Sequence, residues 1–430
     1  MNEFPPINAA EIADDIYYFI TADTTGLGYG TFYDLHEDYL DLPEPPPIGQ
    51  KVDYSSLPIL KGTTGSLFLL KSQTGMGLTA FGKGTEHEGE AFIVFRGTNK
   101  VFAADLLTDA SVGITQRSSY GHPVHNGFSD SFNSMKSQID RFLIECCKRN
   151  IEQLHIIGHS LGGALATLCT EYSKSKYPTL PVKCYTFGSP RVGLRNFSDE
   201  FTRKIGPQNI YRAYHRTDLI PCIPCWPFTH VPITTGADYD YFLPSEGNFA
   251  ALAAHDMKLY KKSVKDKGWE SLRGLRYENL QPTEIEPWLN NKSPISFNPT
   301  NLEYLDKAIN YVLLKVVKGI GSAVGAGLTG SFTLLDQLAY VLRKGIDLTK
   351  HLSTLVLSLL RKIAELLGMR RTIEAADATL AFIRNLFERL HRKVSEQAQK
   401  ILDAVLVNGK SIQKTGLLPR FLFLPDNQLT

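Results

Sequence analysis

The clearest chemical signature in the chain is the segment LHIIGHSLGGALATL at positions 154–168. A short apolar run leads into Ser160, which stands between Gly158 and Gly162, and a stretch of small residues with helical character follows. A tight strand-to-helix turn of this kind has no room for a Cβ on either flank and lifts the serine hydroxyl off the sheet edge. We therefore predict that Ser160 is a nucleophile. The alternative is a structural glycine-rich turn with an incidental serine.

A serine hydroxyl reacts poorly unless a histidine accepts its proton and a carboxylate orients that histidine. In enzymes with this type of turn, the acid and then the histidine follow the serine along the chain. Asp218 comes just after a predicted strand, and we prefer it as the acid over Asp238 and Asp240. His255 ends a run of alanines and is the preferred base, whereas His230 is the alternative.

The negative charge that develops on an ester oxygen needs two converging hydrogen-bond donors. The amide of Leu161, directly after the nucleophile, is the first candidate. The second should come from a loop that follows an earlier strand, and the segment AFIVFRGT at 91–98 provides one. Gly97 permits a turn there, and Thr98 offers both an amide and a hydroxyl. The alternative for Thr98 is an ordinary residue at the end of a strand.

A sheet must position these side chains, and the first 295 residues have the pattern for one. Apolar runs typical of strands alternate with segments of helical periodicity, which predicts an α/β fold with a central, mostly parallel sheet. The expected strands lie within 50–96 and at 154–158, 182–190 and 209–215, and the expected helices at 7–20, 128–149 and 161–174.

The pattern changes to helix alone near residue 296, so we expect an α/β domain over 1–295 and an all-α domain over 296–430. Two apolar stripes at helical spacing are wide enough to bury a face of each helix. They comprise Leu352, Leu355, Val356, Leu359, Leu360, Ile363, Leu366 and Leu367 in the first, and Leu380, Ile383, Phe387, Leu390, Val394, Ala398, Ile401 and Val405 in the second.

Charge is unevenly distributed between these two parts. The whole chain has a net charge of +2, which argues against a nucleic-acid binder. From residue 301 onward there are 18 Lys and Arg against 11 Asp and Glu, a net charge of +7, and the remainder carries 28 against 33. A basic helical part suggests attraction to an anionic membrane surface.

A charge-free stretch at 319–335 is rich in glycine rather than leucine. Three interpretations compete: a close-packed helix pair, an amphipathic surface-seeking hairpin, and a membrane span. The first residues lack the basic and apolar pattern of a secretory signal, which predicts cytoplasmic synthesis, with signal-independent export as a further possibility. The six cysteines show no disulfide or zinc spacing beyond a single Cys222-Ile-Pro-Cys225, so reduced thiols are expected.

Taken together, these motifs resemble the class 3 (fungal-type) lipase family of α/β-hydrolases. The resemblance implies that Ser160, Asp218 and His255 form a catalytic triad and that Thr98 and Leu161 hold the oxyanion. It also implies structural roles for other motif residues and a non-catalytic His230. The matching motifs run in family order over roughly residues 10–265 and are FRGT (95–98), VHNGF (124–128), GHSLGGALA (158–166), YTFGSPRVG (185–193), HRTDLIP (215–221) and the segment around His255.

In that family, a helical lid follows the oxyanion residue and covers an acyl groove. The equivalent segment here is NKVFAADLLTDA, in which Val101 and Phe102 would face the substrate. It lacks the tryptophan common in the family and is less apolar, so strong activation at an oil interface is not expected. The residues after 300 have no counterpart in the family core.

The sequence therefore predicts a serine hydrolase acting on lipid acyl esters, without a metal or cofactor. One alternative is a soluble carboxylesterase acting on small esters. Others are a toxin whose helical domain binds a delivery or inhibitor protein, and a helical domain that itself binds membranes or forms pores.

Overall fold

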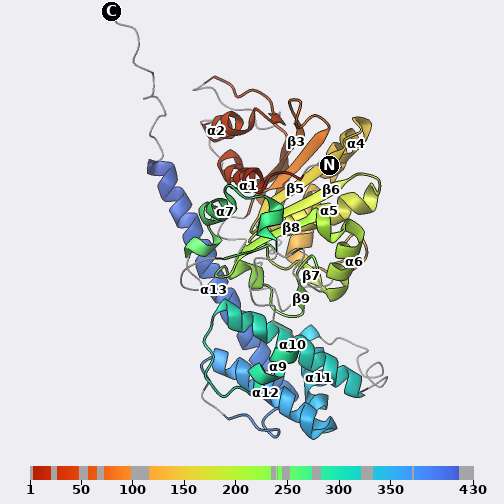
Figure 1. The fold of residues 1–430 in the computed structure, drawn as a ribbon, viewed down its shortest axis with the longest axis vertical. Coiled ribbons are helices and arrows are strands. Elements are labelled where there is room, and N and C mark those ends of the chain that lie inside the picture. Colours follow the sequence, from red (N-terminus) through yellow and green to blue (C-terminus); the bar gives the residue numbers. More distant parts are fainter. Residues whose placement is uncertain are drawn as a thin grey trace, which may run out of the picture.

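The chain folds into an α/β region (residues 3–273) and a helical region (residues 282–415), which lie one above the other in Figure 1. The computed structural model describes residues 3–20, 27–47, 57–64, 72–97, 116–233, 239, 241–244, 252–273, 282–320, 333–369 and 372–415. The predicted residues Thr98, Val101, Phe102, Asp238 and Asp240 lie outside the described residues.

The α/β region is built on one twisted sheet, in which the central strands run parallel. The strand order is β1-β3-β4-β5-β6-β8-β10, with β2 also paired to β3. From β4 to β10 the pairing is parallel, whereas β1, β2 and β3 are antiparallel. The predicted α/β class with a mostly parallel sheet is confirmed. The strands are β1 (Leu40–Asp41), β2 (Ile59–Thr64), β3 (Ser72–Gly82), β4 (Glu90–Phe95), β5 (Gln153–His159), β6 (Val182–Phe187), β8 (Ile210–His215) and β10 (Tyr241–Leu243).

Helices cover both faces of this sheet, because successive strand residues point to opposite sides. In β5, Ile156 packs in one hydrophobic cluster and its neighbour Ile157 in the other. Both are fully buried, as expected for a strand in the middle of a parallel sheet. The first face carries α4 (Asn126–Lys148), α5 (Leu161–Lys176) and α6 (Arg195–Ile205), and the second carries α1 (Pro6–Ile20), α2 (Leu27–His36), α7 (Met257–Val264) and α8 (Trp269–Leu272).

Short elements connect this scaffold at the carboxyl ends of the strands. The turns η3 (Ile220–Cys222) and η5 (Leu252–His255) follow β8 and β10. Elsewhere, η2 (Pro207–Asn209) precedes β8, and β7 (Gly193–Leu194) pairs with β9 (Phe228–Thr229). Because η3 and η5 come after strands of one parallel sheet, they lie at the same sheet edge as the turn after β5.

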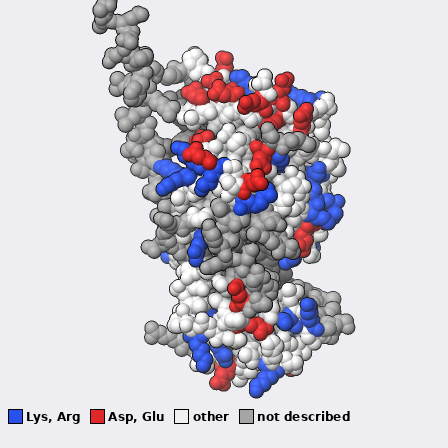
Figure 2. All heavy atoms as spheres, viewed as in Figure 1, with Lys and Arg blue, Asp and Glu red and all other residues white. Residues whose placement is uncertain are grey.

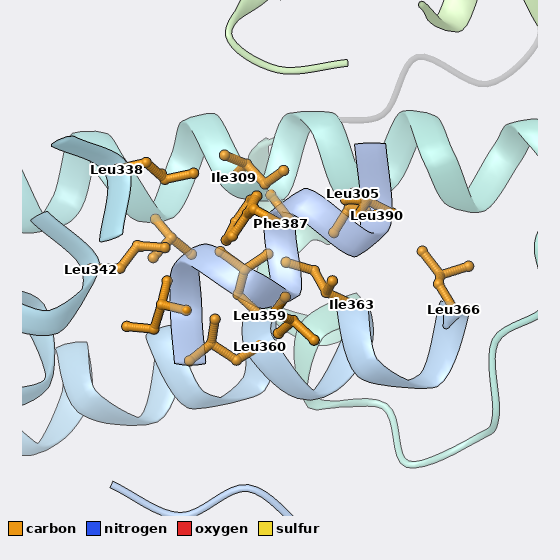
Figure 3. Packing of buried hydrophobic residues seen from close by; sticks show 14 of the residues in the cluster. Leu305, Ile309, Leu338, Leu342, Leu359, Leu360, Ile363, Leu366, Phe387 and Leu390 are labelled. Atoms are coloured by element: carbon orange, nitrogen blue, oxygen red, sulfur yellow. The ribbon is translucent and has the colours of Figure 1, made fainter. Parts of the chain in front are cut away.

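The helical region packs around an aliphatic core, part of which Figure 3 shows from close by. In α12 all the predicted stripe residues up to Leu366 are buried, and in α13 the stripe from Ile383 to Ile401 is buried. Leu380, at the first turn of α13, is 48% exposed, so the second stripe begins one turn later than expected. The helices are α9 (Pro282–Asn290), α10 (Pro299–Ile320), α11 (Leu334–Leu348), α12 (Lys350–Leu366) and α13 (Leu380–Thr415).

Threonines fix the starts of two of these helices. Thr333 caps α11 in a reciprocal pair with Asp336, and the Thr349 hydroxyl accepts the amide of Leu352 at the start of α12. These bonds satisfy amides that have no partner within their own helix.

The aliphatic core contains residues from both sides of the boundary expected at residue 296. Ile285 and Leu289 of α9 already belong to it. So do Leu219, Ile220 and Ile223, which follow β8 in the α/β region. These side chains pack there because α10 lies against η3. The two regions are therefore joined by a shared core.

Figure 2 shows acidic side chains gathered at the end of the α/β region farthest from the helical region, whereas both signs of charge occur over the helical region. No helix among the described residues combines the length and the apolar character needed to cross a bilayer. Most of the charge-free stretch, residues 321–332, lies outside the described part of the chain.

Candidate active site

Ser160 lies in a strained turn between β5 and α5. Its φ of 57° and ψ of −130° are rare for a residue with a side chain. A Cβ on Gly158 would collide with the backbone of Gly162, and one on Gly162 would collide with the carbonyl oxygen of Phe95. The glycines at both flanks are therefore required by close backbone approach, which is the geometry expected of a nucleophile elbow.

The structure brings Ser160, His255 and Asp218 together in one chain of hydrogen bonds. The Ser160 hydroxyl lies 2.9 Å from His255 Nε2, and His255 Nδ1 lies 2.8 Å from Asp218 Oδ2. Ser160 is 6% exposed, Asp218 2% and His255 1%. In this arrangement the histidine can accept the serine proton, while the carboxylate orients the ring and stabilises its charged form.

Two further donors hold the carboxylate of Asp218. The amide of Ile220 donates to Oδ1 at 2.9 Å, and the hydroxyl of Tyr260 donates to Oδ2 at 2.7 Å. Burial, and then the neighbouring Asp218, raise the pKa of Tyr260 well above its ordinary value, so the phenol stays a donor. Tyr260 is not among the site residues that the sequence motifs predict. Its position in the helix directly after His255 is the one local signal that points to it.

A second hydrogen-bond chain connects the first helix to the backbone on either side of the triad. The amide of Gly97 donates to the Tyr17 hydroxyl at 2.9 Å, and that hydroxyl lies 3.0 Å from His159 Nδ1. His159 Nε2 lies 3.0 Å from the carbonyl oxygen of His255. Because that carbonyl can only accept, Nε2 carries the proton and Nδ1 accepts from Tyr17. Burial lowers the pKa of His159 well below its ordinary value, consistent with a neutral ring.

Nothing in the sequence pattern distinguishes Tyr17 from the other residues of its helix. Its hydroxyl meets Gly97 and His159, which are 80 and 142 residues away. Contacts over such separations have no signature in local spacing, so only the tertiary structure reveals them.

The other histidines of the α/β region have different surroundings. His215 is fixed between the carbonyl oxygen of Ala254 and the hydroxyl of Ser263, and burial lowers its pKa to about 4. Burial also lowers the pKa of His230 well below its ordinary value. His255, rather than His230, is the histidine within hydrogen-bond distance of Ser160.

Of the two predicted oxyanion donors, Leu161 lies among the described residues and Thr98 does not. Leu161 is the first residue of α5, where amides have no partner within the helix. The chain that leads to Thr98 passes directly beside the nucleophile, since a Cβ on Gly97 would lie 3.2 Å from the Ser160 Cβ. The roles of Thr98 in the oxyanion hole and of Val101 and Phe102 in a lid stay predictions.

Within the described residues, no group of three or more histidine, cysteine or acidic side chains is arranged to hold a metal ion. All six cysteines are free, including Cys222 and Cys225.

A parallel sheet with a serine elbow after one strand and an acid and a histidine after later ones defines an α/β-hydrolase. The family model "Lipase (class 3)" matches residues 92–228, which contain Ser160 and Asp218. These residues are similar to the class 3 lipases.

Three curated relatives show the same likeness. "Toxin TseL" of Vibrio cholerae is 33% identical over 122 residues, 28% of this chain and 18% of that protein. "Secreted mono- and diacylglycerol lipase 1" of Fusarium solani is 33% identical over 105 residues, 24% of this chain and 30% of that protein. "Phospholipase A1-II 1" of Oryza sativa is 35% identical over 115 residues, 25% of this chain and 28% of that protein. The chain thus spans less than a third of the length of these relatives.

Among solved structures, the Rhizomucor miehei lipase propeptide complex is similar at 22% identity and a TM-score of 0.36. The likeness covers 52% of this chain and 65% of that one.

Proposed function

We propose that this protein is a serine hydrolase that cleaves acyl esters of glycerolipids through an acyl-enzyme intermediate. The observation that carries the proposal is the chain of hydrogen bonds from Ser160 through His255 to Asp218, at 2.9 and 2.8 Å. The similarity to a mono- and diacylglycerol lipase and to a phospholipase A1 supports the choice of substrate.

In the first half of the reaction, Ser160 Oγ attacks the ester carbonyl while His255 Nε2 takes its proton. The amide of Leu161, together with the predicted donor Thr98, stabilises the oxyanion of the tetrahedral intermediate. His255 then protonates the leaving alcohol, and an acyl-serine remains. In the second half, water attacks the acyl-serine with His255 again as the base, and the fatty acid is released.

Replacement of the nucleophile tests the reaction class. The Ser160→Ala variant should lose turnover of a short p-nitrophenyl ester by at least about a thousandfold. Its far-ultraviolet circular dichroism and unfolding temperature should match those of the wild type. A folded variant that keeps its activity would contradict the proposal.

The length of the acyl chain separates a lipase from the alternative, a soluble carboxylesterase. A series of p-nitrophenyl esters from acetate to palmitate gives kcat/KM as a function of chain length. A lipase should prefer the longer chains, and lipid mass spectrometry of treated membranes then identifies the bond and the headgroup. Activity confined to acetate and butyrate would favour the esterase.

We also propose that the helical region brings the enzyme to an anionic membrane surface. On α10, Leu314 is 62% exposed and Val317 is 42% exposed. Lys315 and Lys318 lie on the same turns and supply positive charge. Co-sedimentation with phosphatidylglycerol vesicles should exceed that with phosphatidylcholine vesicles and should weaken in the Leu314→Ser variant. Equal binding to both vesicles by both proteins would contradict this.

A second candidate is a lipase toxin, which the match to "Toxin TseL" favours. In that case, the helical region would bind a delivery or inhibitor protein. The wild type expressed in a bacterial host should stop growth, and the Ser160→Ala variant should not. If that variant remains toxic, the helical region rather than the hydrolase is the toxic part.

A further inference from the structure

The segment that follows the candidate acid is buried by the helical region rather than by the sheet. Leu219, Ile220 and Ile223 are at most 2% exposed and belong to the same aliphatic cluster as Leu302 and Leu305 of α10. The amide of this same Ile220 donates to Asp218 Oδ1. A residue that orients the acid is therefore held in place by side chains from the helical region.

An ion pair fixes the same segment from its other end. The Arg191 guanidinium lies 2.9 Å from Asp306 Oδ1 of α10. The backbone amide of Arg191 donates to the carbonyl oxygen of Ile223 at 2.7 Å. The same guanidinium Nη1 lies 3.5 Å from the carbonyl oxygen of Pro224. Arg191 is 8% exposed, so this ion pair is largely shielded from solvent. Burial, the largest single influence, disfavours the charge of Arg191, but Asp306 together with Cys222 and Cys225 more than offsets it, so the pKa of the guanidinium is raised.

The helical region also supports the turn that carries the base. Helix α13 packs against η5, whose last residue is His255. In Figure 1, α13 runs from the core of the helical region toward the α/β region. Both loops of the triad thus have helical-region neighbours, whereas Ser160 stands on the sheet itself.

We propose that the helical region positions the triad, with Asp306 and Arg191 as positioning residues that fix the segment after Asp218. The inference rests on the proposed serine hydrolase function. Strands hold their residues by a ladder of hydrogen bonds, but η3 and η5 have no such ladder. A loop displaced by about 1 Å can cost about a hundredfold in rate, so its support is part of the active site.

The test measures kcat and KM of the full-length protein on p-nitrophenyl butyrate. In Asp306→Asn, the kcat should fall about tenfold to a hundredfold while the KM changes by less than about twofold. The control is Asp336→Asn, which removes the 2.9 Å ion pair to Arg384 and the charge of the carboxylate that pairs with Thr333 at the start of α11, in the same region. It weakens the helical region without touching the segment after Asp218, so its kcat should match the wild type below its unfolding temperature.

A second variant separates positioning from folding stability. Breaking one side of a buried ion pair destabilises a protein, but replacing both sides by apolar residues is often neutral. The double variant Arg191→Met/Asp306→Leu should therefore unfold near the wild-type temperature and still show the reduced kcat, because the contact to Pro224 is lost. Recovery of kcat in this stable double variant overturns the inference, as does an unchanged kcat in Asp306→Asn.

The serine variant keeps the two proposals apart. If Ser160→Ala is inactive and Asp306→Asn is fully active, the positioning role fails and the hydrolase stands. If Ser160→Ala is active, the hydrolase fails and the positioning role fails with it.

Discussion

The two regions of this protein have interiors of different kinds. The α/β region buries ionisable side chains that bond to one another, such as Asp218, His255 and Tyr260. The core of the helical region is mainly aliphatic, as Figure 3 shows, and its buried polar side chains among the described residues are Ser358, Lys362, His391 and Ser395.

This difference reflects two kinds of physical requirement. Buried polar groups need specific partners at defined distances, and catalysis uses such distances. Aliphatic burial is nondirectional and scales with area, so it can attach one element to another without a special motif. In this chain, the aliphatic core reaches across to Leu219 and Ile220 and thereby meets the polar interior beside Asp218.

The surface of the helical region adds little to its stability. Its charged side chains form exposed pairs at helical spacing, such as Arg343 with Asp347 and Arg384 with Glu388. Exposed pairs of this kind contribute from about zero to 1 kcal/mol each. The aliphatic core, which the two regions share, should therefore contribute more to stability than these surface pairs.

The largest loss of stability should come from a substitution that leaves a cavity in the aliphatic core. Leu359 is fully buried in α12, and Leu359→Ala should lower the free energy of unfolding by about 2–5 kcal/mol. Because this core extends to the segment after Asp218, esterase activity on heating should disappear together with the helical signal in circular dichroism.

A matched variant in the other region is Leu143→Ala, a fully buried leucine of α4. Leu143→Ala should lower the free energy of unfolding by a similar amount. Activity of Leu359→Ala that persists above the temperature at which the helical region melts would show that the regions are independent.

Low pH should destabilise both regions, because each contains a buried histidine that binds a proton more readily in the unfolded chain. Burial lowers the pKa of His125 and of His391 to about 4, from an ordinary value near 6.5. Between these pH values the unfolded chain binds more protons than the folded one. The free energy of unfolding should therefore be highest above pH 6.5. It should fall as the pH falls toward 4, by up to about 3 kcal/mol per histidine.

Denaturant titrations from pH 7.5 to 4.5 measure this slope. The His391→Gln and His125→Gln variants should each flatten it by a comparable amount. A slope unchanged in His391→Gln would mean that this ring is already charged in the folded helical region.

The smallest effect should come from the removal of single hydrogen bonds. The change in kcat should differ between the two regions. Tyr260→Phe removes one donor to Asp218 and should lower kcat about tenfold, the equivalent of about 1.4 kcal/mol. Tyr311→Phe removes a similar bond to Glu286, 2.5 Å long, in the helical region and should leave kcat unchanged. Equal kcat values for the two variants would argue against a positioning role for Tyr260.

Local pattern predicted much of this architecture. Apolar runs and helical periodicity place β5, α5, β6 and β8 within a few residues of their observed bounds, because burial on both faces of a parallel sheet leaves a continuous apolar run. The helix α9, in contrast, lies within residues 1–295, which the sequence pattern assigns to the α/β domain, yet it packs in the aliphatic core of the helical region. Its Ile285 and Leu289 are too few for a recognisable stripe and are recruited by tertiary packing.

The sequence by itself determined the elbow around Ser160, because glycine at both flanks is a local steric requirement that spacing records. It also narrowed the acid and the base to a few residues, since chain order limits the choices. Only the tertiary structure decided that Tyr260, Tyr17 and Asp306 join this site. Their contacts bridge elements distant in sequence, and the free energy of such contacts depends on three-dimensional approach, which no local periodicity encodes.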